Sequence, residues 1–331
     1  MSYIAIIGAG SWGTALTCLL AEKGYDITLW VHNPDLASEM QETRTNTTYL
    51  PDILIPDDIT ITNNLEEAVK KTRYVLNAVP TQYTRSVFEN IVPLLPEESI
   101  IISVSKGIEQ KTLMTVSSIL RELSQHPVAV LSGPSFAKEV IKKLPTAVTL
   151  ATDVTNRGFM LQELFNVNNF RVYTHDDITG VEIGGALKNV MAIAAGIADS
   201  LGLGNSARAS LITRGINEMT RLGVAMGAQE RTFSGLSGIG DLVLTCTSPL
   251  SRNYTVGNKL GQGMKLQDIL NQTKSVAEGI ATAESALELA KKYSIEMPIV
   301  EQVYKVLYEN KKPAHAVEDL MERSLKSEFY G

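Results

Sequence analysis

A glycine-rich turn stands directly between an apolar strand and a helix at the start of this chain. The run Ile4-Ala5-Ile6-Ile7 predicts a buried strand, and Gly8-Ala9-Gly10-Ser11-Trp12-Gly13 follows it without a gap. The next residues predict a helix from Thr14 to Lys23 and a second strand from Asp26 to Val31. A strand, a G-x-G-x-x-G turn, a helix and a second strand together form the βαβ unit that binds dinucleotides.

Each glycine of this turn has a separate task in such a unit. Gly8 permits the tight turn, Gly10 lets the backbone approach a pyrophosphate, and Gly13 lets the helix pack close to the strand. The free N–H groups and the positive dipole end of the helix then face the phosphates. A purely structural turn is the alternative, but such a turn seldom combines all these features. The sequence therefore predicts a dinucleotide site.

Composition limits which binding partners and which cellular compartment can be expected for this chain. A length of 331 residues suits two domains, and a net charge of -6 does not favour nucleic acid, although local positive charge can still bind a phosphorylated metabolite. Cys18 and Cys246 have no metal-ligand spacing, so neither a metal site nor a disulfide framework is expected. The first residues lack a basic signal-peptide region, and charged residues interrupt the apolar stretch 181–203. We expect a cytoplasmic protein without membrane insertion.

The two halves of the chain differ in their periodicity. Short Val/Ile/Leu runs predict buried strands of a mostly parallel sheet at 3–7, 27–31, 73–79, 99–104, 127–131, 146–151 and 170–174. Helical spacing then predicts helices at 178–201, 205–226, 252–261, 278–293, 298–310 and 314–321. We expect a Rossmann-like doubly wound α/β domain over residues 1–179 and an all-α domain over residues 180–331. A Gly/Ser loop is expected at 232–238.

The tip of the second strand bears on the choice of cofactor. An acidic residue at this tip favours NAD, but the strand ends in Val31-His32-Asn33. His32 and Asn33 tolerate a 2′-phosphate, so the sequence predicts use of both NADPH and NADH, with NADPH favoured. The alternative is that His32 is a half-exposed polar residue that closes a strand. Asp35 follows a proline and is expected at a helix start or turn.

Lys188 is the best candidate for proton transfer. It lies in a helix of small and apolar residues, 184–195, where a lysine is costly unless it faces a cleft. Burial near other cations would lower its proton affinity, which suits a general acid/base. The residues alone favour a structural lysine whose ammonium extends to solvent.

Other polar residues follow predicted strands, at the edge where open α/β sheets bind ligands. Lys106 comes directly after the strand that ends at Val104, and Gly133 and Ser135 follow the strand 127–131. A solvated loop lysine is the alternative for Lys106.

Three further positions lie at predicted helix starts. Arg252 and Asn253 open a helix behind Ser251, where a guanidinium and free backbone N–H groups suit a phosphate. Asp241 could be no more than a helix N-cap. Glu278 matches a capping box with Ser275, which would by itself explain the glutamate.

Eight sequence blocks in order resemble the bacterial two-domain NAD(P)-dependent glycerol-3-phosphate dehydrogenases. The glycine turn alone occurs in many dehydrogenase families, but seven further blocks make the resemblance specific over nearly the whole chain. The blocks are residues 8–15, 77–81, 103–109, 132–137, 184–190, 237–242, 251–253 and 276–279. One departure is visible, because the family often has Arg where this chain has His32.

The resemblance implies an oxidoreductase acting on a CH–OH group, which interconverts dihydroxyacetone phosphate and sn-glycerol 3-phosphate with NADPH or NADH. It also implies a role in phospholipid synthesis, a homodimer, and a helical domain like the C-terminal domain of 6-phosphogluconate dehydrogenase. Lys188 is the implied proton donor and acceptor, with Asp241 beside it. The implied substrate contacts are Lys106, Gly133, Ser135, Lys188, Asp241, Ser251, Arg252 and Asn253. The implied cofactor contacts are Gly8, Gly10, Ser11, Trp12, Gly13, His32, Lys106, Ala137, Arg252, Val276 and Glu278.

Two other functions remain open. A dehydrogenase of the same plan could act on a hydroxy acid or sugar acid, which requires a site for a carboxylate and a different catalytic-helix motif. A non-catalytic NADPH-binding sensor would be expected to lose Lys188, Asp241 or Arg252, and all three residues are present.

Overall fold

The computed structural model describes residues 3–272 and 276–328, and the chain divides into two compact units. Unit 1 comprises Met1–Lys106 and Met114–Ile178, and unit 2 comprises Gly107–Leu113 and Thr179–Gly331. The segment Gly107–Leu113 groups with the C-terminal helices although it lies far before them in the sequence. The domain limits at residues 179 and 180 stay a prediction.

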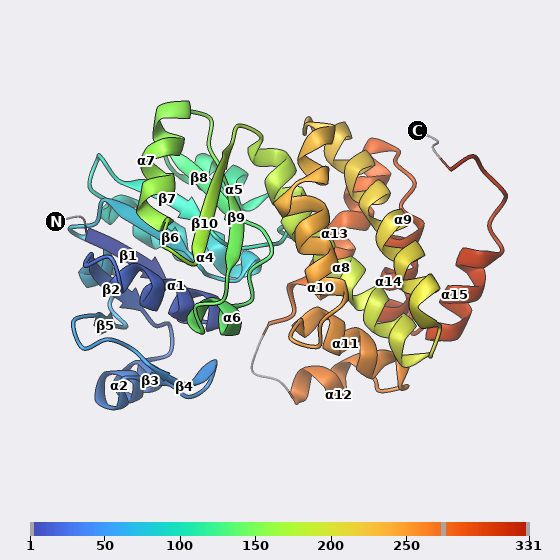
Figure 1. The fold of residues 1–331 in the computed structure, drawn as a ribbon, viewed down its shortest axis with the longest axis horizontal. Helices are drawn as coiled ribbons and strands as arrows, with labels where there is room; N and C mark the ends of the chain where they lie inside the picture. The colour runs from blue at the N-terminus through green and yellow to red at the C-terminus, as the bar shows by residue number, and fades with distance from the viewer. Residues whose placement is uncertain (1–2, 273–275, 329–331) are drawn as a thin grey trace. The chain divides into compact units, whose positions relative to one another are not determined.

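Unit 1 is built on an eight-stranded sheet with the strand order β10-β9-β8-β7-β6-β1-β2-β5 (Figure 1). All neighbouring strands are parallel except β8 and β9. Because β2 and β6 lie on opposite sides of β1, a topological switch point lies at the carboxyl end of β1. The strands are β1 (Tyr3–Ile7), β2 (Asp26–Trp30), β5 (Thr60–Thr62), β6 (Tyr74–Asn77), β7 (Ile100–Ser103), β8 (Val128–Ser132), β9 (Thr146–Ala151) and β10 (Phe170–His175).

The seven predicted strands are present, and the expected fold class is confirmed. The sequence did not predict β5 or the small hairpin of β3 (Thr45–Asn46) and β4 (Leu50–Leu54). β3 and β5 have only two and three residues, and β4, Leu-Pro-Asp-Ile-Leu, is mostly exposed and lacks the continuous apolar run of the other strands.

Both faces of the sheet are covered by helices, which explains why its strands are almost continuously apolar. Ile4 and Ile6 of β1 pack in one core with Leu16 of α1, whereas Ala5 and Ile7 pack in a second core that includes Phe88 of α4. Each of these β1 side chains is almost fully buried. The helices of unit 1 are α1 (Ser11–Ala21), α2 (Pro34–Thr43), α3 (Leu65–Val69), α4 (Thr81–Ile91), α5 (Val116–Leu123), α6 (Ala137–Ile141) and α7 (Thr155–Phe165).

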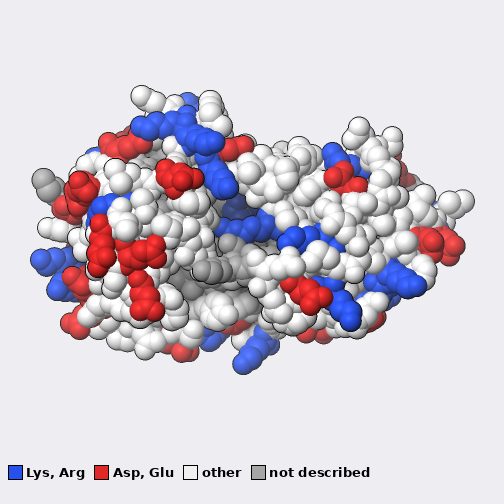
Figure 2. All heavy atoms as spheres, turned by 90° about the horizontal axis from the view of Figure 1, so that it is seen from below, with Lys and Arg blue, Asp and Glu red and all other residues white. Residues whose placement is uncertain are grey.

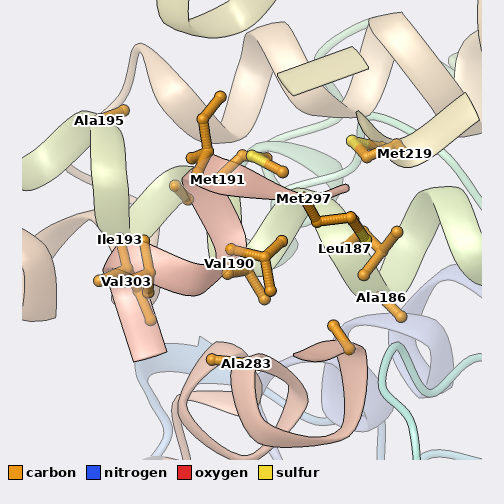
Figure 3. Packing of buried hydrophobic residues seen from close by; sticks show 14 of the residues in the cluster. Ala186, Leu187, Val190, Met191, Ile193, Ala195, Met219, Ala283, Met297 and Val303 are labelled. Atoms are coloured by element: carbon orange, nitrogen blue, oxygen red, sulfur yellow. The ribbon is translucent and has the colours of Figure 1, made fainter. Parts of the chain in front are cut away.

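Unit 2 is helical and is organised around α8, whose side chains are packed on all sides. Figure 3 shows α8 residues such as Leu187 and Val190 among Met219 of α9, Ala283 of α13 and Val303 of α14. By length and composition α8 could cross a membrane, but 94% of its most apolar window is buried inside the structure. The helices are α8 (Ile178–Ser200), α9 (Gly204–Ala225), α10 (Asp241–Cys246), α11 (Arg252–Gly261), α12 (Leu266–Asn271), α13 (Glu278–Tyr293), α14 (Pro298–Tyr308) and α15 (Pro313–Met321).

Helices α8 and α11 approach each other backbone to backbone, and glycines make this approach feasible. A Cβ atom on Gly196 would lie 2.0 Å from the carbonyl oxygen of Tyr254, and one on Gly257 would lie 2.0 Å from that of Ile193. Because Gly196 and Gly257 carry no side chain, the two backbones come close together at these points, which fixes α11 against α8.

The predicted loop at 232–238 is wrong, because the segment is helical. Glu230–Ser234 forms a 3₁₀ helix and Leu236–Gly240 forms a π-helical turn, with Gly238 departing from helical dihedral angles. A Cβ on Gly238 would lie 2.1 Å from the carbonyl oxygen of Phe233. The small residues that suggested a loop instead allow the backbone to fold tightly onto itself.

Charged side chains of both signs occur on the face drawn in Figure 2. The whole chain carries 30 Lys and Arg residues against 36 Asp and Glu residues. Any anion site therefore depends on local groups and not on the overall charge.

Candidate functional site

The glycine turn at the end of β1 has the backbone geometry that a dinucleotide requires. A Cβ on Gly13 would lie 1.9 Å from the carbonyl oxygen of Gly8, and one on Gly8, where φ is +113°, would lie 2.8 Å from the carbonyl oxygen of Ala78. A Cβ on Gly10 would meet nothing within 4 Å. Two glycines are thus required by packing, while Gly10 opens the backbone to a ligand. These residues fit a pyrophosphate at the N-terminus of α1.

A buried asparagine from outside the motif holds the glycine turn in place. The Asn46 Nδ2 atom donates hydrogen bonds to the Ala9 carbonyl oxygen and to Thr14 Oγ1, both at 2.8 Å. Ser11 Oγ donates to the carbonyl oxygen of Tyr49 at 2.7 Å. The sequence analysis missed Asn46, because nothing in its own neighbourhood marks it as a partner of the turn.

Trp12 is the half-buried second residue of α1, and its ring lies 6.5 Å from that of Phe170. Its indole Nε1 is buried and has no hydrogen-bond acceptor among the described residues. Buried donors are normally satisfied, so an acceptor from a bound molecule would complete this site.

The tip of β2 presents an exposed imidazole. The His32 ring lies 5.6 Å from the Trp30 ring, and its side chain is exposed. Asn33 caps α2, since its Oδ1 atom accepts hydrogen bonds from the backbone N–H groups of Asp35 and Leu36 at 2.8 and 3.1 Å. The structure therefore confirms that Asp35 lies at a helix start. The Asn33 Oδ1 atom serves as the N-terminal cap of α2.

Polar groups from two strand ends meet at the carboxyl edge of the sheet. Lys106 Nζ donates to the Gly133 carbonyl oxygen at 2.9 Å, and Ser135 Oγ donates to the same oxygen at 3.0 Å. Gly133 has φ +141°, and a Cβ there would lie 3.0 Å from Val148 Cα. The structure thus brings these three predicted site residues together. Ala137 begins α6 just beyond them.

In unit 2 the Lys188 ammonium is buried against a carboxylate and a hydroxyl. Lys188 is 7% exposed, and its Nζ atom donates to Asp241 Oδ1 and to Thr245 Oγ1, both at 2.8 Å. Thr245 Oγ1 in turn donates to the Asp241 backbone oxygen at 2.6 Å. The side chain does not extend to solvent, and its charged partner is Asp241, the residue that the resemblance places beside it.

The Asp241 carboxylate reaches Lys188 because the π-helical turn before it packs directly on α8. A Cβ on Gly184 would lie 2.4 Å from the Ser237 carbonyl oxygen. Asp241 is the first residue of α10, whose N-cap is Gly240, so the N-cap interpretation of Asp241 is wrong. Thr245 was not predicted, although its spacing of four residues from Asp241 places both on one helix face.

The start of α11 combines an exposed guanidinium with a capped helix end. Ser251 is the N-cap, as expected, and its Oγ accepts from the Tyr254 N–H at 3.2 Å. Arg252 is exposed, whereas Asn253 is buried. The Arg252 side chain and the first backbone N–H groups of this helix end are groups of the type that suits an anion.

The Asn253 amide has partners within the protein. Its Nδ2 atom donates to Asn189 Oδ1 at 2.9 Å, and its Oδ1 atom accepts from the Gly279 N–H at 3.0 Å. Glu278, just before this glycine, is half-buried and begins α13, and Val276 is exposed. Ser275, and with it the predicted capping box, lies outside the described residues.

Neither thiol belongs to the reacting groups. Burial raises the pKa of Cys246 to about 12, and burial together with Glu22 raises the pKa of Cys18 to about 11. Both thiols are therefore protonated at neutral pH and lack nucleophilic character. Within residues 3–272 and 276–328 there is no group of three or more His, Cys, Asp or Glu residues that could hold a metal ion.

Comparisons with known proteins agree over the whole chain. The family model for the N-terminus of NAD-dependent glycerol-3-phosphate dehydrogenase matches residues 3–157, and the model for its C-terminus matches residues 177–318. Curated glycerol-3-phosphate dehydrogenases (NAD(P)+) of Citrifermentans bemidjiense and Geobacter sulfurreducens are 55% and 53% identical over 329 residues, which cover 98% of this chain and of each relative.

A crystal structure of glycerol-3-phosphate dehydrogenase from Coxiella burnetii has a TM-score of 0.94 and 41% identity. The match covers 97% of this chain and 99% of that one. The motifs, the fold and these matches agree over nearly the whole chain. The chain therefore belongs to the NAD-dependent glycerol-3-phosphate dehydrogenase family.

Proposed function

We propose that this chain reduces dihydroxyacetone phosphate to sn-glycerol 3-phosphate, reversibly, in the cytoplasm, and so supplies glycerol phosphate for phospholipid synthesis. As a member of this family the chain is an oxidoreductase, and its cofactor is NADH or NADPH. The observation that carries the proposed reaction is the buried ion pair of Lys188 and Asp241, at 2.8 Å, on the helix that bears the family's Gly-Gly-Ala-Leu-Lys-Asn sequence.

The glycine turn of unit 1 would hold the cofactor. Gly8 and Gly13 shape the turn. Gly10 would leave room for the pyrophosphate, and the first N–H groups of α1 would donate hydrogen bonds to it. Further cofactor contacts are proposed for Ser11, Trp12, His32, Lys106, Ala137, Arg252, Val276 and Glu278. When bound, the nicotinamide supplies the hydride for the carbonyl carbon.

Lys188 would supply the proton. As the C2 carbon of dihydroxyacetone phosphate receives the hydride, the C=O π electrons move to the oxygen, which takes a proton from Lys188 Nζ. The products are a C2–H bond, a hydroxyl group and a neutral amine, which regains its proton from solvent. Asp241 and Thr245 fix the direction of the Nζ atom, and so reduce the entropy cost of this transfer.

The substrate phosphate would bind at the start of α11. Arg252 offers a guanidinium fork, and the backbone N–H groups behind Ser251 add donors at the positive end of a ten-residue helix. Lys106, Gly133 and Ser135 are proposed to contact the rest of the substrate. This binding site suits a phosphate dianion, which distinguishes the proposal from reduction of a keto acid to a hydroxy acid.

The test is oxidation of NADPH by the purified chain in a spectrophotometer. Dihydroxyacetone phosphate should support turnover, whereas pyruvate and 2-ketopantoate, which carry a carboxylate in place of the phosphate, should not. Turnover with one of these keto acids and none with dihydroxyacetone phosphate would refute the proposed substrate. NADPH binding without any turnover would favour the sensor alternative.

A further inference from the structure

The β3–β4 hairpin carries a side chain that reaches the glycine turn from outside the motif. Asn46, at the end of β3, is fully buried. Its Nδ2 atom donates hydrogen bonds to the Ala9 carbonyl oxygen and to Thr14 Oγ1, both at 2.8 Å. Its Oδ1 atom accepts from the Tyr49 N–H at 3.1 Å. Both amide hydrogens and the amide oxygen therefore have partners, and they join the glycine turn, the first turn of α1 and the hairpin.

A second hydrogen bond joins the hairpin to the start of α1, and this time the hairpin accepts. Ser11 Oγ, on the first residue of α1, donates to the Tyr49 carbonyl oxygen at 2.7 Å. The base of the hairpin is closed by a hydrogen bond of 2.7 Å from the Ile55 N–H to the Arg44 carbonyl oxygen. Residues 44–55 thus form a closed loop, which meets the glycine turn through Asn46 and Tyr49.

The bond from Asn46 to Ala9 bears on the part of the turn where a pyrophosphate would bind. The Ala9–Gly10 peptide is trans, and a trans peptide points its C=O and N–H groups in opposite directions. A carbonyl oxygen held by Asn46 therefore also fixes the direction of the Gly10 N–H. A Cβ on Gly10 would meet nothing within 4 Å, so the backbone is open to a ligand at this residue. Asn46 thus sets the orientation of the peptide that leads into the open part of the turn.

We infer that Asn46 is a positioning residue for the dinucleotide, whose amide keeps the Ala9–Gly10 peptide in one orientation and so links docking of the β3–β4 hairpin to cofactor affinity. This inference rests on the proposed place of the pyrophosphate at the glycine turn, but it does not depend on the identity of the substrate. Because such a link is reciprocal, a bound cofactor should also stabilise the docked hairpin.

Cofactor affinity tests the positioning role. In Asn46→Ala the Ala9 carbonyl oxygen loses a buried partner, and the Kd for NADPH should rise about 10- to 100-fold. The value of kcat at saturating NADPH should stay within about threefold, since the amide contacts no reacting group. Asn46→Asp retains the size of the side chain but cannot donate to the Ala9 oxygen, so its Kd should rise at least as far. An unchanged Kd in both variants would overturn the inference.

ADP-ribose shows which part of the cofactor depends on Asn46. It carries the pyrophosphate but lacks the nicotinamide, so Asn46→Ala should weaken ADP-ribose and NADPH by the same factor. Isothermal titration calorimetry measures both values of Kd. A loss confined to NADPH would mean that Asn46 acts on the nicotinamide end, and would contradict a role through the glycine turn.

Thr72→Val is the matched control for a general loss of stability. The Thr72 hydroxyl is buried and comes directly before β6 at the amino edge of the sheet, whereas the glycine turn lies at the carboxyl edge. It donates to the Tyr74 carbonyl oxygen at 2.7 Å and accepts from the Ala5 N–H at 3.1 Å. The control should lower Tm, as Asn46→Ala does, but leave the Kd for NADPH within about twofold. Equal losses of affinity in the two variants would show that Asn46 acts only through stability.

Hydrogen exchange of the hairpin gives a readout that does not depend on activity. In the wild type, saturating NADPH should slow exchange of the Tyr49 N–H about tenfold or more, and in Asn46→Ala this slowing should be largely lost. Equal slowing in the two proteins would contradict the link between hairpin and cofactor.

Two further arms keep the result decisive. Where both Asn46 variants fail to fold, Thr14→Val removes one acceptor of the same amide and should raise the Kd for NADPH about threefold to tenfold; an unchanged Kd would count against the inference. A wild-type chain that binds NADPH with the expected exchange pattern, but does not oxidise it with dihydroxyacetone phosphate, would refute the proposed function and leave the role of Asn46 intact.

Discussion

The two units of this chain build their candidate sites from different parts of the polypeptide. In unit 1 backbone groups predominate, namely a glycine turn, the first N–H groups of α1 and the carbonyl oxygen of Gly133, with the side chains of Lys106 and Ser135 beside that oxygen. Unit 2 offers side chains: the Lys188–Asp241 pair and Arg252, all presented by helices. A backbone site depends on where side chains are absent, whereas a side-chain site depends on partners that hold each charge in place.

The largest effect is expected at the ion pair of unit 2. Lys188→Ala removes the proposed proton donor, and kcat should fall about 1,000-fold or more while NADPH affinity stays near that of the wild type. Steady-state kinetics and NADPH fluorescence titration measure the two quantities. A kcat within tenfold of the wild-type value would refute the assignment of Lys188.

Arg252 tests whether unit 2 binds a phosphate. Loss of a charge-assisted contact should cost about 2–4 kcal/mol in kcat/KM, hence roughly 30- to 1,000-fold, with dihydroxyacetone phosphate. Dihydroxyacetone itself should be a very poor substrate of the wild type, and Arg252→Ala should reduce it little further. Equal losses on both substrates would mean that Arg252 acts through the cofactor or the fold.

Alanine substitutions at two glycines of unit 1 distinguish a role in packing from a role in ligand binding. Gly13→Ala forces a methyl group to within 1.9 Å of the Gly8 carbonyl oxygen, so it should destabilise the protein by about 3 kcal/mol or more. Gly10→Ala meets open space and should change stability by no more than about 0.5 kcal/mol, yet weaken NADPH binding. Thermal unfolding and NADPH titration distinguish the pair. Equal loss of stability in both variants would contradict the open approach at Gly10.

Unit 2 also carries a buried acid whose titration affects stability. Glu218 accepts hydrogen bonds from the Ile299 and Val300 N–H groups, and burial raises its pKa to about 7, with Arg221 and Arg323 opposing the shift. The unfolded chain ionises at the ordinary carboxyl pKa, so the native state holds the proton more tightly between that pKa and about 7. The contribution of protonated Glu218 to the free energy of unfolding is therefore fully present below this window, and it is lost as the pH rises through the window.

The Glu218→Gln variant has no carboxyl group at this position. The difference in the free energy of unfolding between the variant and the wild type therefore measures this pH dependence. As the pH rises from about 5 to about 8, the free energy of unfolding of the variant should increase by about 3 kcal/mol relative to that of the wild type. Urea unfolding at both pH values measures the change. A difference that does not vary with pH would show that Glu218 ionises normally in the folded protein.

The same contrast explains what could be predicted from the sequence. The glycine turn is contiguous, and its strand and helix carry local periodicity, so the candidate cofactor site of unit 1 and the buried helix around Lys188 could be recognised from the sequence. Ser251 as an N-cap was equally local. Asn46 was not predictable, because it reaches the turn across 37 residues, and neither was the Asn189–Asn253 link across 64 residues.

The errors have a related physical cause. Small residues at 232–238 were interpreted as a loop, but Gly184 and Gly238 allow close backbone contacts that only the tertiary fold requires. Those contacts bring Asp241 to Lys188, a pairing that the resemblance implied but that the local sequence does not explain. A glycine signals conformational freedom locally, and its use for close packing becomes visible only with its neighbours in place.

The smallest effect is expected at His32, which with Asn33 forms the tip of β2 on which the proposed cofactor preference depends. His32 is exposed, and the Asn33 oxygen beside it is committed to the cap of α2. An imidazole can give a 2′-phosphate one hydrogen bond, whereas Arg adds a full charge and a fork of donors. His32→Arg should therefore raise the ratio of kcat/KM for NADPH over NADH about tenfold, which corresponds to about 1.4 kcal/mol. His32→Asp should reverse the preference, because its carboxylate accepts hydrogen bonds from the ribose hydroxyls and repels the phosphate. Equal ratios in the wild type and both variants would show that the tip of β2 does not contact the ribose, and that unit 1 selects its cofactor through backbone alone.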